Sequence, residues 1–300
     1  MKKREQFNRI GNQMLDASRI SRVGVIGAGT MGHGIAQVFA QSGFQVKLND
    51  VSIDFIDKGM KRIQGNLDRS IEKGRMNREQ KERVLDMITS TPNLEDFSDR
   101  QFVVEAVLEK IEVKRDVFKR LDKLVGKETI LASNTSSIPI TELAALVSNP
   151  GRVAGMHFFN PVPVMKLVEI VRALQTSDAT IETIRAVSTK LGKTPVVVKD
   201  AAGFVSNRIV CPMINEAIFA LEEGIATRED IDTVMKLGMN HPMGPLELAD
   251  FVGLDVVLDV LEVLYEEYHD PKYRASALLR NMVRAGYLGR KTKKGFYDYP

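Results

Sequence analysis

Strand and helix patterns alternate along the first 200 residues. Residues 22–26 form a short apolar run, residues 33–43 place Ile35, Val38 and Phe39 on one helical face, and residues 44–50 alternate apolar with polar side chains. Periods of 2 and 3.6 residues predict a strand, a helix and a strand in that order. Further strands are predicted at 101–107, 129–132 and 195–198, two more within 153–170, and helices near 113–124 and at 178–191. This order is typical of an α/β fold with a Rossmann-type sheet.

A charged helical pair is predicted after residue 50. Apolar residues recur at helical spacing from Ile56 to Ile71, and Asn77 with Gln80 has the pattern of a capping box that opens a second helix through residue 88. We therefore expect a helical insertion in the sheet domain. Its basic side chains are Lys61, Arg62, Arg69 and Lys73. They form either a solvated face or a site for a phosphorylated ligand, and charge alone favours the solvated face.

The pattern changes at residue 200, where strand alternation stops. Helices are predicted at 204–221, 228–237, 246–268 and 275–285. We therefore expect a sheet domain over 21–199 and an all-helical domain over 200–300. A broad apolar stripe on the longest helix comprises Leu254, Val257, Leu258, Leu261 and Leu264. Because so wide a stripe is often shared with a second copy, it predicts a homodimer formed through this domain.

Composition is that of an ordinary two-domain protein of 300 residues. Lys and Arg number 42 against 39 Asp and Glu, a net charge of +3, which argues against nucleic acid or an acidic membrane as partner. The single cysteine, Cys211, excludes an intrachain disulfide and a thiolate metal cluster, and it fits a reducing compartment such as the cytoplasm. Four scattered histidines make a metal site unexpected.

Membrane and targeting signals are weak. No apolar run is long enough to span a bilayer, and no segment has the architecture of a signal peptide. Residues 1–20 contain basic residues but also Glu5 and Asp16, so a surface extension is favoured over an organelle transit peptide.

A glycine turn follows the first predicted strand. In a dinucleotide fold Gly27 permits the tight turn, Gly29 lets the backbone approach the pyrophosphate, and Gly32 lets helix and strand pack closely. The acid Asp50 ends the second strand, where it would accept hydrogen bonds from a ribose and repel a 2′-phosphate. Because strand, helix and acid spacing all agree, the turn predicts a site for NAD rather than NADP.

His157 and Glu169 lie on two predicted strands joined by a turn at Asn160, Pro161 and Pro163. Strands folded back on each other would bring the two side chains together. A carboxylate would hold the imidazole in one tautomer and stabilise its protonated form, as a proton-transfer catalyst needs. Taken alone, the two residues are better explained by a core histidine and an unrelated edge residue.

Polar residues follow two other strands. Glu105 and Glu109 lie at the carboxyl end of one, and the segment 133–137 (SNTSS) lies beyond the other. Ligands bind at the carboxyl ends of strands in open α/β sheets, so this hydroxyl cluster is a candidate site. Alternatively, its serines and threonine cap the helix that begins near Pro139.

Seven stretches together resemble the short-form L-3-hydroxyacyl-CoA dehydrogenase family, which includes bacterial 3-hydroxybutyryl-CoA dehydrogenases. They are VGVIGAGTMGHGIA, VVEAVLEK, LASNTSSIPI, MHFFNPVPVMKLVEI, DAAGFVSNRIVCPMINEA, MKLGMNHPMGPLELADFVGLD and LGRKTKKGFYDY, in family order from Val23 to Tyr299. The resemblance implies a nicotinamide-binding α/β domain and a helical dimerisation domain. The chain departs from the family at Lys294, where glycine is common, and in its twenty leading residues; we expect the change at Lys294 to lie on the surface.

The resemblance also implies residue roles. His157 matches the catalytic histidine and Glu169 the carboxylate that orients it, while Ser136 and Asn207 match residues that hold the substrate oxygen. Expected cofactor contacts are Gly27, Gly29, Thr30, Met31, Gly32, Asp50, Glu109, Lys114 and Asn134. Expected substrate contacts are Ser136, Asn160, Asn207 and Lys73, the last near coenzyme A. The expected reaction is hydride transfer from C3 of an acyl-CoA thioester to NAD, in a cleft whose closure excludes water.

Two other functions remain open from the sequence. One is a related dehydrogenase of a free hydroxy or sugar acid, which would not depend on coenzyme A. The other is a non-catalytic NAD-binding relative, against which the set of Ser136, His157, Glu169 and Asn207 argues.

Overall fold

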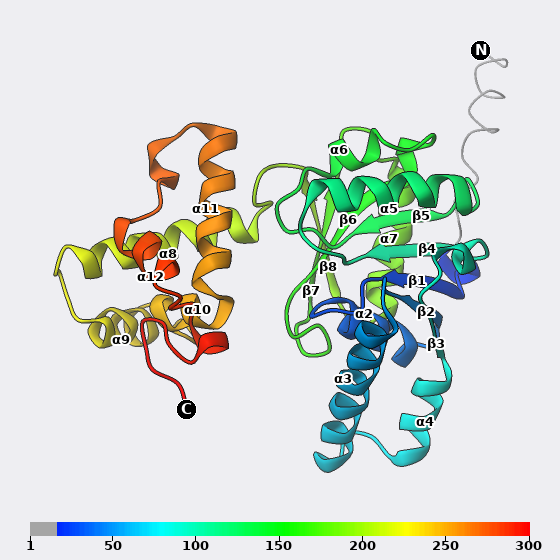
Figure 1. Ribbon diagram of the computed structural model, residues 1–300, viewed down its shortest axis with the longest axis horizontal. Helices are drawn as coiled ribbons and strands as arrows, with labels where there is room; N and C mark the ends of the chain where they lie inside the picture. The colour runs from blue at the N-terminus through cyan, green and yellow to red at the C-terminus, as the bar shows by residue number, and fades with distance from the viewer. Residues whose placement is uncertain (1–16) are drawn as a thin grey trace. The chain divides into compact units, whose positions relative to one another are not determined.

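The computed structural model describes residues 17–300 and separates into two compact units, one ending at Asp200 and the other spanning Ala201–Pro300 (Figure 1). Residues 17–20 belong to the first unit rather than to a surface extension, because Ile20 is buried in its core. The rest of the expected extension lies outside the described residues.

Unit 1 is built on an eight-stranded sheet with the order β3-β2-β1-β4-β5-β6-β7-β8. All neighbouring strands are parallel except β6 and β7. The strands are β1 (Arg22–Ile26), β2 (Gln45–Asn49), β3 (Ile88–Thr91), β4 (Phe102–Glu105), β5 (Ile130–Ser133), β6 (Val153–Phe158), β7 (Leu167–Arg172) and β8 (Thr194–Lys199). The chain order reverses between β1 and β4, the usual ligand position in such sheets.

The helices of unit 1 cover both faces of this sheet. They are α2 (Gly32–Gln41), α3 (Ile53–Glu72), α4 (Arg78–Asp86), α5 (Ile111–Leu124), α6 (Ile140–Ala144) and α7 (Asp178–Lys190), with 3-10 turns at Ala17–Arg19, Leu94–Phe97 and Pro150–Arg152. Figure 1 shows α5 and α7 on opposite sides of the sheet. Phe39 of α2 packs against Phe44 and Phe102 at ring distances of 5.3 and 6.0 Å, near the centre of one core layer. The predicted α/β class with its Rossmann-type sheet is confirmed.

The predicted helical pair is present, but its second helix ends earlier than expected. The capping box at Asn77 is present, since Asn77 accepts from the Gln80 amide at 2.8 Å and donates its own amide to Gln80 at 2.9 Å. However, α4 ends at Asp86, and Ile88 begins β3 instead of ending the helix. The pair α3 and α4 is therefore the crossover between parallel strands β2 and β3. A four-residue edge strand was missed because so short an apolar run carries no clear period.

Unit 2 is helical, with one predicted helix divided. Its elements are α8 (Ser206–Glu222), α9 (Arg228–Gly238), α10 (Pro245–Val252), α11 (Leu254–Tyr268), α12 (Ala277–Arg284) and 3-10 turns at Pro271–Tyr273 and Arg290–Thr292. The single helix expected over 246–268 is wrong, because Gly253 has a φ of 107° and separates α10 from α11. Lys294 is exposed, as expected, with its ammonium 4.4 Å from the Tyr287 ring centroid.

The apolar stripe of α11 is largely buried inside unit 2 itself. Leu254, Val257, Leu261 and Leu264 are each fully buried among the residues of one core cluster. The stripe is therefore not the dimer surface that was expected from the sequence.

Candidate active site

The glycine turn connects β1 to α2 at the carboxyl edge of the sheet. Gly27 has a φ of 97°, and a Cβ added there would lie 2.4 Å from Ala106 O. At Gly32 an added Cβ would lie 1.7 Å from Gly27 O, whereas at Gly29 it would meet no atom within 4 Å. Gly27 and Gly32 are thus required by close packing, and Gly29 leaves open space beside the backbone.

Asp50 lies directly beside this turn. Its Oδ2 accepts from the Ala28 amide at 2.7 Å, and its Oδ1 accepts from the Val51 amide at 2.8 Å. A carboxylate has further acceptor positions beyond these two bonds, and the ribose contact of Asp50 stays a prediction. Thr30 is exposed in the turn and Met31 precedes α2; their expected contacts with a cofactor stay predictions.

His157 and Glu169 are brought together by the antiparallel register of β6 and β7, which pairs the two residues directly. The two residues are 7% and 2% exposed, and His157 Nδ1 lies 2.9 Å from Glu169 Oε2. Since a carboxylate accepts, Nδ1 is the donor, which leaves Nε2 as the basic nitrogen of the neutral ring. The Phe159 ring packs 4.7 Å from the imidazole. The spatial pairing expected from the sequence is therefore present.

The segment after β5 is bonded to β6 and to the loop that follows β4. Asn134 Oδ1 accepts from the Phe158 amide at 2.9 Å, beside His157. Glu109 Oε1 accepts from the amides of Ser136 and Ser137 at 2.9 and 3.2 Å and from the Ser137 hydroxyl at 3.1 Å. These contacts place the segment that carries Ser136 at the same sheet edge as His157.

The alternative role of this segment as a helix cap is wrong. The N-cap of α6 is Pro139, which makes no side-chain cap hydrogen bond. Asp200 Oδ2 instead accepts from the Thr141 amide at 2.7 Å, in the first turn of α6. The hydroxyl of Thr135 accepts from the Ile138 amide at 2.9 Å, a local turn before the helix.

Lys114 is almost fully buried behind Glu109, at 1% exposure. Its ammonium lies 2.7 Å from Glu105 Oε1 and 3.2 Å from Glu109 Oε2. Burial on its own raises the pKa of the Glu109 carboxyl, but Lys114 and the donors Thr135 and Ser136 outweigh it, so the net pKa lies below the ordinary value. The direct cofactor contacts expected for Glu109 and Lys114 stay predictions. Glu105 could not be recognised as their partner from the sequence, because helix packing decides that contact.

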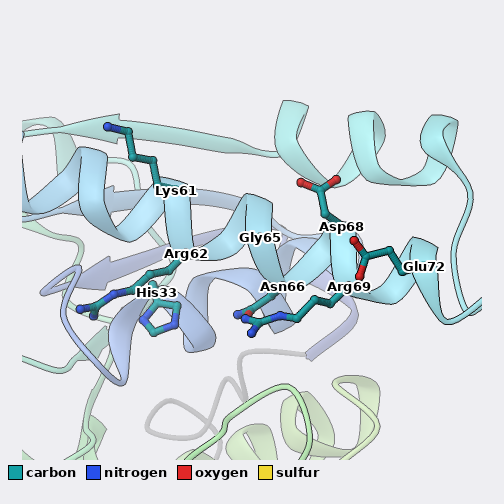
Figure 2. A pocket seen from close by; sticks show the side chains of 8 residues that line it. All are labelled: His33, Lys61, Arg62, Gly65, Asn66, Asp68, Arg69 and Glu72. Carbon is teal, nitrogen blue, oxygen red and sulfur yellow. The ribbon is translucent and has the colours of Figure 1, made fainter. Parts of the chain in front are cut away.

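A surface cavity lies along α3. Figure 2 shows His33, Arg62, Asn66 and Arg69 gathered on one side of α3. The complete lining is His33, Lys61, Arg62, Gly65, Asn66, Asp68, Arg69 and Glu72. His33 Nδ1 lies 2.6 Å from Gly29 O, so the cavity begins next to the glycine turn. Burial lowers the pKa of His33, the Gly29 carbonyl opposes that shift, and Arg62 adds to it.

Three further predicted residues lie on other elements of the chain. Lys73 is the C-cap of α3, beyond the cavity lining, and Asn160 is exposed in the turn between β6 and β7. The ammonium of buried Lys193 anchors that turn by donating to Met165 O at 2.7 Å and to Val162 O. Asn207 lies in the first turn of α8 in unit 2.

No group of three or more histidine, cysteine and acidic side chains in residues 17–300 is placed to hold a metal ion. No helix within the same residues is long and apolar enough to cross a membrane.

Comparison with known proteins assigns the family. Residues 22–201 match the model of the 3-hydroxyacyl-CoA dehydrogenase NAD binding domain, and residues 203–299 match the 3-hydroxyacyl-CoA dehydrogenase C-terminal domain. The chain is 54% identical over 278 residues to a probable 3-hydroxybutyryl-CoA dehydrogenase of Deinococcus radiodurans, covering 93% of this chain and 100% of the relative.

Similar agreement extends to a mitochondrial relative and to a solved structure. The human mitochondrial hydroxyacyl-coenzyme A dehydrogenase is 44% identical, covering 93% of this chain and 91% of the relative. The crystal structure of (S)-3-hydroxybutyryl-CoA dehydrogenase from Ralstonia eutropha is similar with a TM-score of 0.91 and 52% identity, covering 94% of this chain and 99% of that one. The chain belongs to the 3-hydroxyacyl-CoA dehydrogenase family.

Proposed function

We propose that this protein catalyses the NAD-dependent oxidation of (S)-3-hydroxyacyl-CoA to 3-ketoacyl-CoA and the reverse reduction, with 3-hydroxybutyryl-CoA and acetoacetyl-CoA as its substrates. The observation that carries this proposal is the buried 2.9 Å hydrogen bond between His157 and Glu169. It lies near the carboxyl end of β6, at the edge of the sheet where the glycine turn follows β1. Relatives that are about half identical to this chain carry the name of this activity.

The glycine turn fits an NAD molecule. Its backbone is bare beside Gly29, where an added Cβ would meet nothing within 4 Å, and α2 begins three residues later. Amides at a helix N-terminus suit a pyrophosphate, and the adjacent Asp50 suits a ribose without a 2′-phosphate. When bound, NAD would accept the hydride that leaves C3 of the substrate.

His157 would move the proton in this reaction. Because Nδ1 donates to Glu169, Nε2 would take the hydroxyl proton from the substrate during oxidation and return it to the ketone during reduction. Glu169, at 2% exposure, is screened little by solvent and would stabilise the imidazolium. Ser136 would hold the substrate oxygen as its charge develops. The matching role of Asn207 rests on the family resemblance.

The cavity on α3 would bind the phosphates of coenzyme A. Its lining carries three cationic side chains, Lys61, Arg62 and Arg69, against the acids Asp68 and Glu72. Lys73 ends the same helix and would extend this basic surface. Under this proposal the basic residues bind a ligand, whereas charge alone favours a solvated face.

The first experiment follows NADH absorbance with acetoacetyl-CoA, beside free acetoacetate and beside NADPH. Rapid oxidation with the thioester and NADH alone is the expected result. Turnover of free acetoacetate at the same rate would favour a dehydrogenase of free acids. Binding of NADH without turnover of either substrate would contradict the proposal and indicate a non-catalytic relative.

We also propose a homodimer formed through unit 2, although the α11 stripe does not supply its surface. Large apolar side chains remain exposed on or next to α9, with Val234 at 60%, Leu237 at 82% and Met239 at 62%. Light scattering should give twice the chain mass of 33.5 kDa. Leu237→Glu should shift the mass toward one chain, and a monomeric wild type would contradict this proposal.

We also propose a cytoplasmic location. Its support is the single cysteine, Cys211, which is buried and has no partner cysteine for a disulfide. Cell fractionation with antibody detection would test it.

A further inference from the structure

A buried group of charges behind the SNTSS segment has no role in the proton or hydride transfer described above. Glu105 ends β4 at 0% exposure, Lys114 lies in the first turns of α5 at 1%, and Ser133 ends β5 at 0%. Each buried ion costs several kcal/mol of desolvation, and replacing such a pair by apolar residues often leaves stability unchanged or improves it. Fold stability alone is therefore a weak explanation for charges at this position.

The Glu105 carboxylate joins three segments of the chain. Its Oε1 accepts from Lys114 Nζ and from the Val107 amide, both at 2.7 Å. Its Oε2 accepts from the Ser133 hydroxyl at 2.6 Å. One side chain therefore ties the exit of β4 and the start of α5 to the end of β5.

Two chains of contacts lead from Glu105 to residues 135–137. In the first, Lys114 reaches Glu109 Oε2 at 3.2 Å, and the other oxygen of Glu109 accepts from the amides of Ser136 and Ser137. In the second, the Ser133 hydroxyl accepts from the Thr135 amide at 3.2 Å.

The two oxygens of Glu109 face different partners. Its side chain is 39% exposed, so solvent competes for its oxygens, and the ammonium of Lys114 is what turns Oε2 inward and Oε1 toward the amides. Lys114 is in turn placed by Glu105, which is wholly shielded from solvent.

We propose that Glu105 is a positioning residue of the active site: through Lys114 and Ser133 it fixes residues 135–137 and so holds Ser136 at the substrate oxygen. This role rests on the proposed function for the part played by Ser136. It gives a function to a buried charge for which fold stability alone is a weak explanation.

The test uses Glu105→Gln in the full-length protein. We expect kcat for acetoacetyl-CoA reduction to fall roughly 10- to 100-fold, since a donor misplaced by a fraction of an ångström loses much of its effect on the transition state. KM for the thioester should change by less than about threefold, because the thioester loses no contact. The matched control is Glu112→Gln, which removes an exposed carboxylate from α5, the helix that carries Lys114.

A double-mutant cycle separates positioning from a general loss of stability. If Glu105 acts through Ser136, then Glu105→Gln combined with Ser136→Ala should lose little more kcat than the worse single variant. The proposal would be overturned if the kcat losses of the two single variants multiply in the double variant. An unchanged kcat in Glu105→Gln would overturn it as well. If Glu105→Gln does not fold, the variant Glu105→Gln with Lys114→Met, which removes both charges, takes its place.

Hydrogen exchange provides a readout that does not need activity. The amides of Ser136 and Ser137 should exchange at least about tenfold faster in Glu105→Gln, while those of β6 keep their wild-type protection. Unchanged exchange at these two residues would also overturn the proposal. If the wild type fails to reduce acetoacetyl-CoA, the proposed function falls, and exchange still decides whether Glu105 positions the segment.

Discussion

At the scale of single residues, chemistry depends on which side chains share a face of the sheet. His157 meets Glu169 because β6 and β7 are antiparallel in a register that pairs them. A slip of one residue would send the two side chains to opposite faces. Asp50 meets the glycine turn because β1 and β2 are parallel neighbours that end together.

His157→Gln should lower turnover by roughly two to four orders of magnitude, because glutamine cannot exchange a proton near neutral pH. NADH binding measured by fluorescence should be unchanged. The matched control is His269→Asn, an exposed histidine with a φ of 49° that asparagine tolerates. Turnover of His157→Gln within a few fold of wild type would rule out its role as general acid and base.

Asp50→Ala should weaken NAD more than NADP, because it removes both the ribose acceptor and the charge that repels a 2′-phosphate. It also removes the acceptor of the Ala28 amide, so some loss of affinity for both cofactors is expected. The ratio of the two dissociation constants is therefore the deciding measurement. A ratio equal to that of wild type would remove Asp50 from the ribose site.

At the scale of elements, one glycine divides the helix that periodicity predicts across residues 246–268. The apolar spacing continues through Gly253, but its φ of 107° is in a region that side chains with a Cβ rarely adopt. The break separates α10 from α11, whose buried residues pack into the same core cluster.

Gly253→Ala should destabilise unit 2 by about 1–3 kcal/mol, the usual cost of forcing a residue with a Cβ into such a conformation. Gly238→Ala is the control: Gly238 ends α9, and an added Cβ there would meet nothing within 4 Å. That variant should be stabilised by about 0.4–1 kcal/mol. Urea unfolding measures both, and equal shifts in the two variants would contradict the strain at Gly253.

At the scale of the whole molecule, each unit has a hydrophobic core of its own. The two units also differ in their spectroscopic signals. All six tyrosines lie at position 265 or later and the chain has no tryptophan, so the near-ultraviolet tyrosine signal reports unit 2. The strands all lie in unit 1 apart from isolated bridges near the C-terminus.

Acidification should destabilise unit 1 before unit 2. Burial raises the pKa of Asp122 and of Glu109, but hydrogen bonds and cationic partners outweigh it and lower both. Their stabilisation is complete above the unfolded values of about 4 and is lost as pH falls through the lower folded values. In unit 2 burial raises the pKa of Asp250 and Asp259. Protonating them as pH falls therefore removes the free-energy cost of burying a charged carboxylate.

The measurement compares two signals in thermal unfolding between pH 7 and about 3. Far-ultraviolet circular dichroism should show a partial loss at a temperature where the tyrosine signal of unit 2 persists. The carboxyls of unit 2 with lowered pKa, Glu229 and Asp270, are exposed, so solvent screens their ion pairs. Coincident transitions at every pH would contradict the difference between the units.

Local patterns in the sequence determined most of the secondary structure and much of the site. The strand, turn and helix from Arg22 to Gln41 follow from period and glycine spacing, which depend on residues close together in the chain. The turn after His157 likewise placed Glu169 twelve residues later on the returning strand. The family resemblance added Ser136, Asn207 and the coenzyme A contacts, which no periodicity indicates.

Only the tertiary structure decided the contacts between distant segments. Glu105, Lys114 and Ser133 come from two strands and a helix, and they meet because β4 lies beside β5 and α5 packs across them. The burial of the α11 stripe inside unit 2 was decided in the same way. Sequence period specifies which face of an element is apolar, but the partner that covers that face depends on the packing of the whole chain.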